Sequence, residues 1–92
     1  MFNKITIIGS GLIGSSLLRV INKKKLSKYI NVFDKSKDVT SFIKGNFSVN
    51  VCSNISESVE ESDLVIISTP LSSYKEILLS IKLNLKKDVI LT

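Results

Sequence analysis

Apolar positions change their spacing repeatedly along this chain. Ile5, Ile7 and Ile8 form a short β-branched run that ends at Gly9, as is typical of a buried parallel strand. From Leu12 onward the apolar residues return at helical spacing instead. The sequence therefore opens with a predicted strand, a glycine turn and a helix. The expected apolar face of that helix consists of Ile13, Leu17, Val20 and Ile21.

The alternation continues through the middle of the sequence. Tyr29–Phe33 predicts a second strand, and Ser36 can cap a short helix that Gly45 is expected to end. Phe47–Val51 predicts a weaker strand, and one or two helical turns are expected between Ser56 and about Glu61. The apolar positions of the helix after Ser36 are Val39, Phe42 and Ile43.

Leu64–Ile67 is the clearest buried strand in the chain, and Asp88–Leu91 begins a further one. Between them Pro70 fits a helix start, because its missing N–H is not needed there. Strands joined by helical crossovers predict an α/β fold, a doubly wound parallel sheet that reaches the start of its fifth strand. Ligands of such sheets bind at the carboxyl ends of the strands. The expected face of the last helix consists of Leu71, Tyr74, Leu78, Ile81 and Leu85.

Composition limits the class of protein. Of the 92 residues, 43% are hydrophobic and 23% are charged, so we expect one folded domain spanning 1–92. The apolar runs are far shorter than the roughly 20 residues of a membrane span, and the N-terminus lacks a signal-peptide pattern. Cys52 is the only cysteine and histidine is absent. These features predict a cytoplasmic location, with no membrane partner and no metal site.

The net charge is +5, which raises the question of a nucleic-acid partner. Lys23, Lys24, Lys25 and Lys28 cluster where the first helix is expected to end, and cations are favoured there by the helix dipole. Lys86-Lys87 fall in a connector. No basic stretch is flanked by aromatic residues that could stack on bases, so we expect no nucleic-acid partner.

Gly9-Ser10-Gly11-Leu12-Ile13-Gly14 fits the pattern G-x-G-x-x-G. The pattern alone is weak, but here it follows a predicted strand and opens a predicted helix. Gly9 would let the chain turn, Gly11 would let the backbone approach a pyrophosphate, and Gly14 would let the helix pack closely. Free N–H groups at the helix start would then bind the phosphates. The sequence thus predicts a Rossmann-type dinucleotide site in which all six residues contact the cofactor.

Asp34 lies at the end of the second predicted strand, 20 residues after the last glycine. A carboxylate there can accept hydrogen bonds from the adenosine ribose and would repel a 2′-phosphate, which favours NAD as the cofactor. Lys35 and Lys37 could attract that phosphate, so NADP remains an alternative at this point. We count Asp34 and Lys35 among the expected cofactor-binding residues.

Ser68-Thr69-Pro70 follows the fourth predicted strand at the same edge of the sheet. The helix after it begins near Pro70, so the first N–H groups of that helix could face the cofactor, although the segment is also an ordinary helix start. We include all three residues in the expected cofactor site.

Cys52 is interpreted as a small, partly buried hydrophobic residue. Ser15 and Ser16 have no histidine to activate them as nucleophiles.

Two segments together resemble the prephenate and arogenate dehydrogenases. Gly11-Leu12-Ile13-Gly14-Ser15-Ser16-Leu17 resembles the start of the first helix in that family. Asp63-Leu64-Val65-Ile66-Ile67-Ser68-Thr69-Pro70-Leu71 is similar to its fourth strand and Thr-Pro loop. Val32-Phe33-Asp34-Lys35 looks like the end of its second strand, with lysine where the family often has arginine. The resemblance covers the whole chain.

This resemblance implies oxidative decarboxylation of prephenate to 4-hydroxyphenylpyruvate with reduction of NAD, a step of tyrosine biosynthesis. In that family the catalytic histidine, a serine, the substrate-binding arginine and a helical dimerisation domain all lie further along the chain. No residue of this chain is therefore assigned a catalytic role. We expect a partial NAD-binding domain, inactive alone, from an enzyme that is a homodimer at full length.

Other interpretations keep the same fold. The substrate could be arogenate instead of prephenate, and 3-hydroxyacid dehydrogenases and pyrroline-carboxylate reductases use a similar nucleotide domain. A non-catalytic alternative is an NAD-sensing module like the regulatory domains of potassium-uptake systems. The Leu-Ile-Gly-Ser-Ser run and the Thr-Pro loop favour the prephenate and arogenate family over these.

Overall fold

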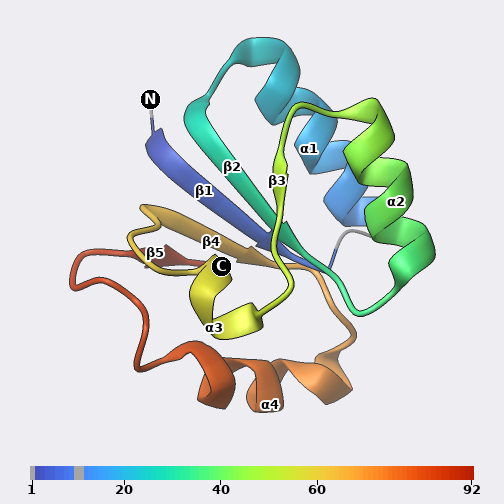
Figure 1. Ribbon diagram of the computed structural model, residues 1–92. Coiled ribbons are helices and arrows are strands. Elements are labelled where there is room, and N and C mark those ends of the chain that lie inside the picture. Colours follow the sequence, from blue (N-terminus) through green and yellow to red (C-terminus); the bar gives the residue numbers. More distant parts are fainter. Residues whose placement is uncertain (1, 10–11) are drawn as a thin grey trace.

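Five parallel strands form one sheet with helices on both of its faces (Figure 1). The computed structural model describes residues 2–9 and 12–92. Strands and helices alternate along these residues as the sequence predicts. The elements in chain order are β1 (Phe2–Ile8), α1 (Leu12–Lys24), β2 (Ser27–Phe33), α2 (Lys37–Asn46), β3 (Asn50–Val51), α3 (Ile55–Ser58), β4 (Leu64–Ile67), α4 (Leu71–Ile81) and β5 (Ile90–Leu91).

The strand order is β3-β2-β1-β4-β5. The chain moves outward from β1 through β2 to β3, and then returns past β1 to form β4 and β5 on the other side (Figure 1). The order therefore reverses next to the central strand, and in sheets of this kind the ligand crevice lies at the carboxyl ends of the strands there. The predicted doubly wound, Rossmann-type fold is confirmed.

One face of the sheet packs against α1 and α2, which lie on the same side of the molecule (Figure 1). Successive residues of a strand point to opposite faces of the sheet. Apolar residues two positions apart in β1 and in β2 therefore enter this core. The helices contribute Leu18, Ile21 and Ile43, all nearly inaccessible to solvent. The strand residues in this cluster are Ile5, Ile7, Ile30 and Val32.

The opposite face packs against α3 and α4. Ile8 and Val65 from the sheet meet Val59, which follows α3, and Ile77 and Ile81 from α4. Because both faces are covered by helices, the central strands carry apolar side chains in both directions, as buried parallel strands do. This explains why β1 and β4 appear in the sequence as almost continuous apolar runs.

The predicted apolar face of α1 is rotated relative to the observed one. Leu18 is fully buried, whereas Val20, which was expected in the core, is 47% exposed. Gly14, Leu18 and Ile21 form the buried stripe, at helical spacing of four and then three residues. Since a glycine begins this stripe, an apolar pattern alone could not locate it.

The boundaries of α2 are partly as predicted. Ser36 caps its start, because the side-chain oxygen accepts a hydrogen bond from the backbone N–H of Val39 at 3.3 Å. Gly45 was expected to end the helix, which is wrong: the helix continues to Asn46, and Gly45 has no positive φ. Phe42, one of the predicted apolar positions of this helix, is 45% exposed.

The second half of the chain differs from the prediction in detail. The single turn α3 begins after Asn54, whose side chain accepts a hydrogen bond from Glu57 N, and not at Ser56. On α4 the buried stripe includes Ile77, which was not predicted. Leu85 lies beyond the end of α4 and still packs against the second core.

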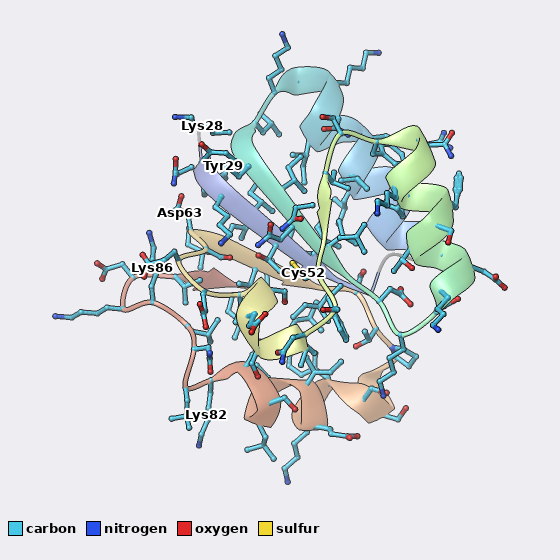
Figure 2. The ribbon with its side chains drawn as sticks, in the orientation of Figure 1. Lys28, Tyr29, Cys52, Asp63, Lys82 and Lys86 are labelled. Atoms are coloured by element: carbon cyan, nitrogen blue, oxygen red, sulfur yellow. The ribbon has the colours of Figure 1, made fainter. Side chains whose placement is uncertain are left out.

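The basic residues are distributed over several elements. Lys23 and Lys24 occupy the last turn of α1, as predicted. Lys28 was also expected near the end of this helix, but it lies in β2. Its Nζ is 5.6 Å from the centroid of the Tyr29 ring (Figure 2). Lys86 lies in the connector between α4 and β5, as predicted, and forms an ion pair with Asp63. The net positive charge is therefore not concentrated on one face of one helix.

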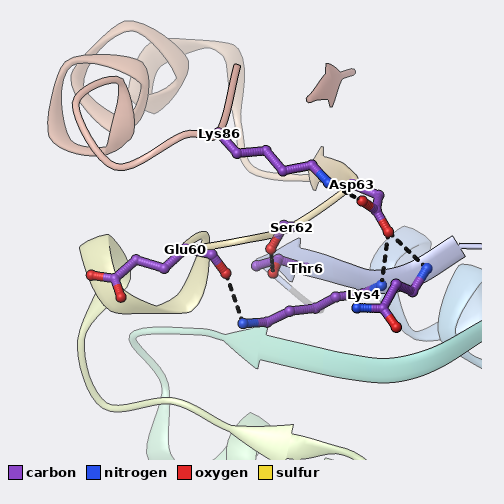
Figure 3. Close-up of polar contacts among 7 residues, drawn as sticks. Lys4, Thr6, Glu60, Ser62, Asp63 and Lys86 are labelled. Atoms are coloured by element: carbon purple, nitrogen blue, oxygen red, sulfur yellow. Dashed lines mark hydrogen bonds and ion pairs between the residues drawn. The ribbon is translucent and has the colours of Figure 1, made fainter. Parts of the chain in front are cut away.

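Asp63 joins three segments at the amino ends of the strands (Figure 3). Its Oδ2 accepts hydrogen bonds from Asn3 N at 2.7 Å and Lys4 N at 3.1 Å, and its Oδ1 pairs with Lys86 Nζ. The hydrogen bond from Lys86 lowers the pKa of the Asp63 carboxyl most, and the two backbone N–H groups lower it further. The same contact raises the pKa of Lys86. This cluster secures the start of β1 against the segment that leads into β4 and against the connector between α4 and β5.

Candidate nucleotide-binding crevice

The carboxyl ends of β1, β2 and β4 lie side by side, and backbone hydrogen bonds fix their relative positions. Gly9 N donates to Phe33 O at 2.8 Å, and Ser68 N donates to Ile8 O at 2.9 Å. Three segments that the sequence singles out separately, those at Gly9, Asp34 and Ser68, therefore meet at one edge of the sheet.

Gly9 has the geometry that a tight turn requires. Its φ is +81°, in the left-handed region where a side chain is strained. A Cβ added to Gly9 would lie 2.6 Å from Thr69 Cγ2 and 2.9 Å from the Ser68 carbonyl oxygen. The turn after β1 is thus packed directly against the loop after β4, and only glycine fits between them.

Gly14 allows the start of α1 to approach that same turn. A Cβ at Gly14 would lie 2.5 Å from the Gly9 carbonyl oxygen and 2.9 Å from Ser68 Oγ, which itself donates a hydrogen bond to Gly9 O. The sequence predicts that Gly14 permits close helix packing, and the structure identifies the end of β1 as what it packs against. Ser10 and Gly11 lie outside the described residues, as do the side chains of Leu12 and Ile13.

A cavity of about 310 Å³ opens at this edge of the sheet. Its walls are mainly apolar, and its polar groups come from the ends of β2 and β4. Six residues of the predicted site line it, namely Gly9, Asp34, Lys35, Ser68, Thr69 and Pro70. The lining consists of Ile8, Gly9, Phe33, Asp34, Lys35, Ile55, Ser68, Thr69, Pro70, Ser73 and Ile77.

Sequence reasoning missed the apolar walls of this cavity. Ile55 belongs to the single turn α3, and Ile77 lies two turns into α4. The spacing of Ile77 seven residues after Pro70 was an available signal, because such residues share a face of one helix. For Ile55 no signal existed, since a single turn carries no periodicity.

The hydroxyl of Thr69 is buried, and no described residue gives it a hydrogen-bond partner. A buried polar group without a partner is costly, by about 1–3 kcal/mol, so such groups are normally satisfied. Thr69 lines the cavity, and a polar group of a ligand could therefore supply the missing partner. Together with the glycine turn, this residue fits a bound dinucleotide.

Asp34 is held in place by the chain that follows it. Its Oδ1 accepts a hydrogen bond from Ser36 N at 2.8 Å, and Ser36 in turn caps α2. A second cavity of about 400 Å³ adjoins the first, because Phe33, Asp34 and Lys35 line both. The rest of its lining is Lys37, Thr40, Val51, Cys52 and Ser53.

Cys52 is partly buried, as the sequence predicts, and lies near the centre of the view in Figure 2. Burial raises the pKa of its thiol, although the charge of Lys4 acts in the opposite direction. A thiol with a raised pKa is a poor nucleophile at neutral pH.

Within residues 2–9 and 12–92 there is no group of three or more His, Cys, Asp or Glu side chains that could hold a metal ion.

A larger hollow of about 510 Å³ lies away from the carboxyl ends of the strands. It separates β2 from the segment that leads into β3, and Lys4, Lys28 and Tyr29 are among its lining residues. It contains neither the glycine turn nor the loop after β4. We therefore place the candidate site in the smaller cavity, where ligands of doubly wound sheets bind.

No helix formed by the described residues has the length and apolar character needed to cross a membrane.

Comparison with known proteins identifies the family. A family model described as NADP oxidoreductase, coenzyme F420-dependent, matches residues 4–92. The chain belongs to this family. Its fold, its glycine turn and its crevice are those of a Rossmann-type NAD(P)-binding domain of an oxidoreductase.

Curated relatives extend the comparison. A cyclohexadienyl dehydrogenase of Zymomonas mobilis is 35% identical over 92 residues, which cover 99% of this chain and 31% of that enzyme. This similarity confirms the resemblance to prephenate and arogenate dehydrogenases. A UDP-N-acetylmuramoylalanine–D-glutamate ligase of Buchnera aphidicola is 37% identical over 82 residues, or 87% of this chain and 18% of the ligase. The chain thus spans a third or less of the length of these relatives.

Solved structures of dehydrogenases and reductases share the fold. A 3-hydroxyisobutyrate dehydrogenase of Mycobacterium tuberculosis superimposes with a TM-score of 0.85 at 20% identity, over 99% of this chain and 31% of that one. A pyrroline carboxylate reductase of Plasmodium falciparum, solved with NADP bound, gives a TM-score of 0.78 at 22% identity, over 97% of this chain and 32% of that one. At these identities the likeness establishes the architecture alone.

Proposed function

We propose that this chain is the NAD-binding part of a prephenate dehydrogenase, an enzyme that converts prephenate to 4-hydroxyphenylpyruvate in tyrosine biosynthesis. The observation that carries the proposal is the similarity to a cyclohexadienyl dehydrogenase along 99% of the chain. The similarity to the UDP-N-acetylmuramoylalanine–D-glutamate ligase covers a smaller part of this chain, 87%, and only 18% of the ligase. Arogenate remains the alternative substrate, to be distinguished by experiment.

The residues of the crevice have distinct tasks in this proposal. Gly9 and Gly14 keep side chains out of the turn, so that the N-terminus of α1 is accessible to the pyrophosphate. Asp34 accepts hydrogen bonds from the adenosine ribose, and the hydroxyl of Thr69 gains a polar partner. When bound, NAD supplies the acceptor for the hydride that leaves the substrate.

Cofactor choice depends on the end of β2. The family description names NADP, whereas Asp34 supports NAD, because a carboxylate in the crevice would repel a 2′-phosphate. Lys35 and Lys37 line the adjoining cavity and weaken that repulsion. The backbone hydrogen bond from Ser36 holds the Asp34 carboxylate in place at this position. We therefore propose NAD as the preferred cofactor.

Substrate chemistry is assigned to parts outside these 92 residues. Proton transfer near neutral pH usually employs histidine, and this chain has none. The chain alone should bind NAD without turning over prephenate or arogenate. In the proposal a further, mostly helical domain supplies the catalytic residues and the dimer interface, in a cytoplasmic enzyme.

A chimaera tests the proposal. The part of the Zymomonas mobilis cyclohexadienyl dehydrogenase that matches this chain is replaced by residues 1–92, and NADH formation is followed by absorbance with prephenate and with arogenate. The expected result is turnover of a substrate that the unmodified Zymomonas mobilis enzyme oxidises, since the preference between prephenate and arogenate is set by the rest of that enzyme. A matched chimaera carrying Gly14→Ala serves as the control and should be impaired. A folded chimaera that binds NAD but oxidises neither substrate would contradict the proposed function.

A further inference from the structure

A buried polar network lies between the sheet and α3, outside the crevice. Thr6, Ser58 and Ser62 are completely inaccessible to solvent, and Asn31 is 6% exposed. Thr6 Oγ1 donates to the Ser58 carbonyl oxygen at 2.6 Å, and Asn31 Nδ2 donates to the same oxygen at 3.1 Å. The two strands β1 and β2 thus both bind the last carbonyl of α3.

The network extends to either side of this carbonyl. Thr6 Oγ1 and Ser62 Oγ are hydrogen-bonded at 2.6 Å, and Figure 3 shows these two side chains in contact. On the other side, Asn50 of β3 donates to Asn31 Oδ1 at 3.2 Å. Such groups are expensive to bury and must be mutually satisfied, so the network defines one position for α3 on the sheet.

α3 depends on these contacts because it is only four residues long. A single helical turn is not stable by itself in water. Its start is capped by Asn54, and Ser56 Oγ ties it to Ser80 O of α4 at 3.0 Å. Its end is fixed by the two hydrogen bonds from Thr6 and Asn31.

The first residue of this turn, Ile55, forms a wall of the crevice. Ser58 Oγ donates to the Ile55 carbonyl at 2.6 Å, which links the anchored end of the turn to the residue in the crevice. We propose that Thr6 and Asn31 are positioning residues, which set cofactor affinity by holding α3 so that Ile55 closes the apolar wall. This inference rests on cofactor binding in the crevice.

The test measures NAD affinity in Thr6→Val, which keeps the shape of the side chain and removes its donor. Thr6→Val loses the hydrogen bonds to Ser58 O and Ser62 Oγ, and loss of the one that holds α3 should raise the Kd for NAD about fivefold or more. Amide hydrogen exchange of residues 55–58 should accelerate in the same variant. Asn31→Ala, which removes the other donor, should act in the same direction.

Two controls separate positioning from a general loss of stability. Ile43→Val lies in the other core, beneath α2, and should lower the melting temperature without changing the Kd of the folded protein. In an Ile55→Ala background, Thr6→Val should have little further effect on the Kd, because both changes act through one wall. Additive effects would show that Thr6 does not act through Ile55.

The outcomes distinguish this inference from the proposed function. If the unmodified chain binds no NAD, the proposed function fails and the inference fails with it. If the unmodified chain binds NAD and both Thr6→Val and Asn31→Ala bind it equally well, only the positioning role is overturned. If Thr6→Val does not fold, Asn31→Ala alone decides the result, since it leaves the Thr6 hydrogen bonds intact.

Discussion

Replacing Gly14 with alanine should disturb the crevice through a contact of one methyl group. The added Cβ would lie 2.5 Å from the Gly9 carbonyl oxygen, so that oxygen must retreat by about 0.5 Å merely to reach the 3.0 Å below which such contacts essentially do not occur. The opposing atom is backbone at a turn with φ of +81°, which cannot rotate away as a side chain would. The strain must therefore be relieved by moving the start of α1 or the turn itself.

The size of the effect follows from two opposing terms. Overpacking of this kind costs about 1–3 kcal/mol, and alanine regains about 0.5–1 kcal/mol of helix stability over glycine. We expect a net loss of about 1–2 kcal/mol, or about 5–15 °C in melting temperature for a domain of this size. Displacing the turn should also weaken NAD binding at least about tenfold, equivalent to one hydrogen bond to a charged group.

Gly45→Ala is the matched control for this substitution. Gly45 also lies within a helix, and a Cβ there would meet no atom within 4 Å. Only the helix term remains, so this variant should gain about 0.5–1 kcal/mol and bind NAD unchanged. Thermal unfolding by circular dichroism and calorimetric titration measure both quantities. If Gly14→Ala matches Gly45→Ala in stability and affinity, the close approach between α1 and the turn is not as described.

Three further predictions concern charge and activity. Asp34→Ala should weaken NAD binding by roughly 10–150-fold, since a charged hydrogen bond of about 1.5–3 kcal/mol is lost, and calorimetry that shows no change would refute its role. The pKa of Asp63 is lowered in the folded protein, so its ionised carboxylate stabilises the fold at pH values above the ordinary aspartate pKa of about 3.9. This contribution to the free energy of unfolding is lost as the pH falls through the pKa of the folded protein. Unfolding free energy should therefore decrease below about pH 4, less steeply in Asp63→Asn, and identical pH profiles of the two proteins would contradict this. Finally, the 92-residue chain alone should form no NADH from NAD with prephenate or arogenate, whereas absorbance above the background rate would show that residues interpreted as structural are catalytic.

Much of the architecture could be predicted because it rests on local signals. The β-branched runs of β1 and β4 are typical of buried strands, and Ser36 marks the start of α2 through hydrogen bonding within its own segment. The crevice was predictable for a related reason. Parallel strands place their carboxyl ends together, so the residues that follow them meet whatever their separation in sequence.

The remaining features depend on tertiary packing, which periodicity does not encode. The stripe that buries Leu18 and exposes Val20 begins at Gly14, and its position is set by contact with Gly9. The wall formed by Ile55 depends on a turn too short to show a pattern. The network around the Ser58 carbonyl joins residues from two strands and a turn that look unremarkable where they stand in the sequence.

The most direct test of this account is calorimetric titration of the 92-residue chain with NAD and, separately, with NADP. Both cofactors offer the same pyrophosphate and nicotinamide, so a difference between them reports on the 2′-phosphate and on the charged residues at the end of β2, Asp34, Lys35 and Lys37. We expect saturable binding of NAD at one site, with NADP binding more weakly. Absence of binding by either cofactor, or NADP binding as tightly as NAD, would contradict it.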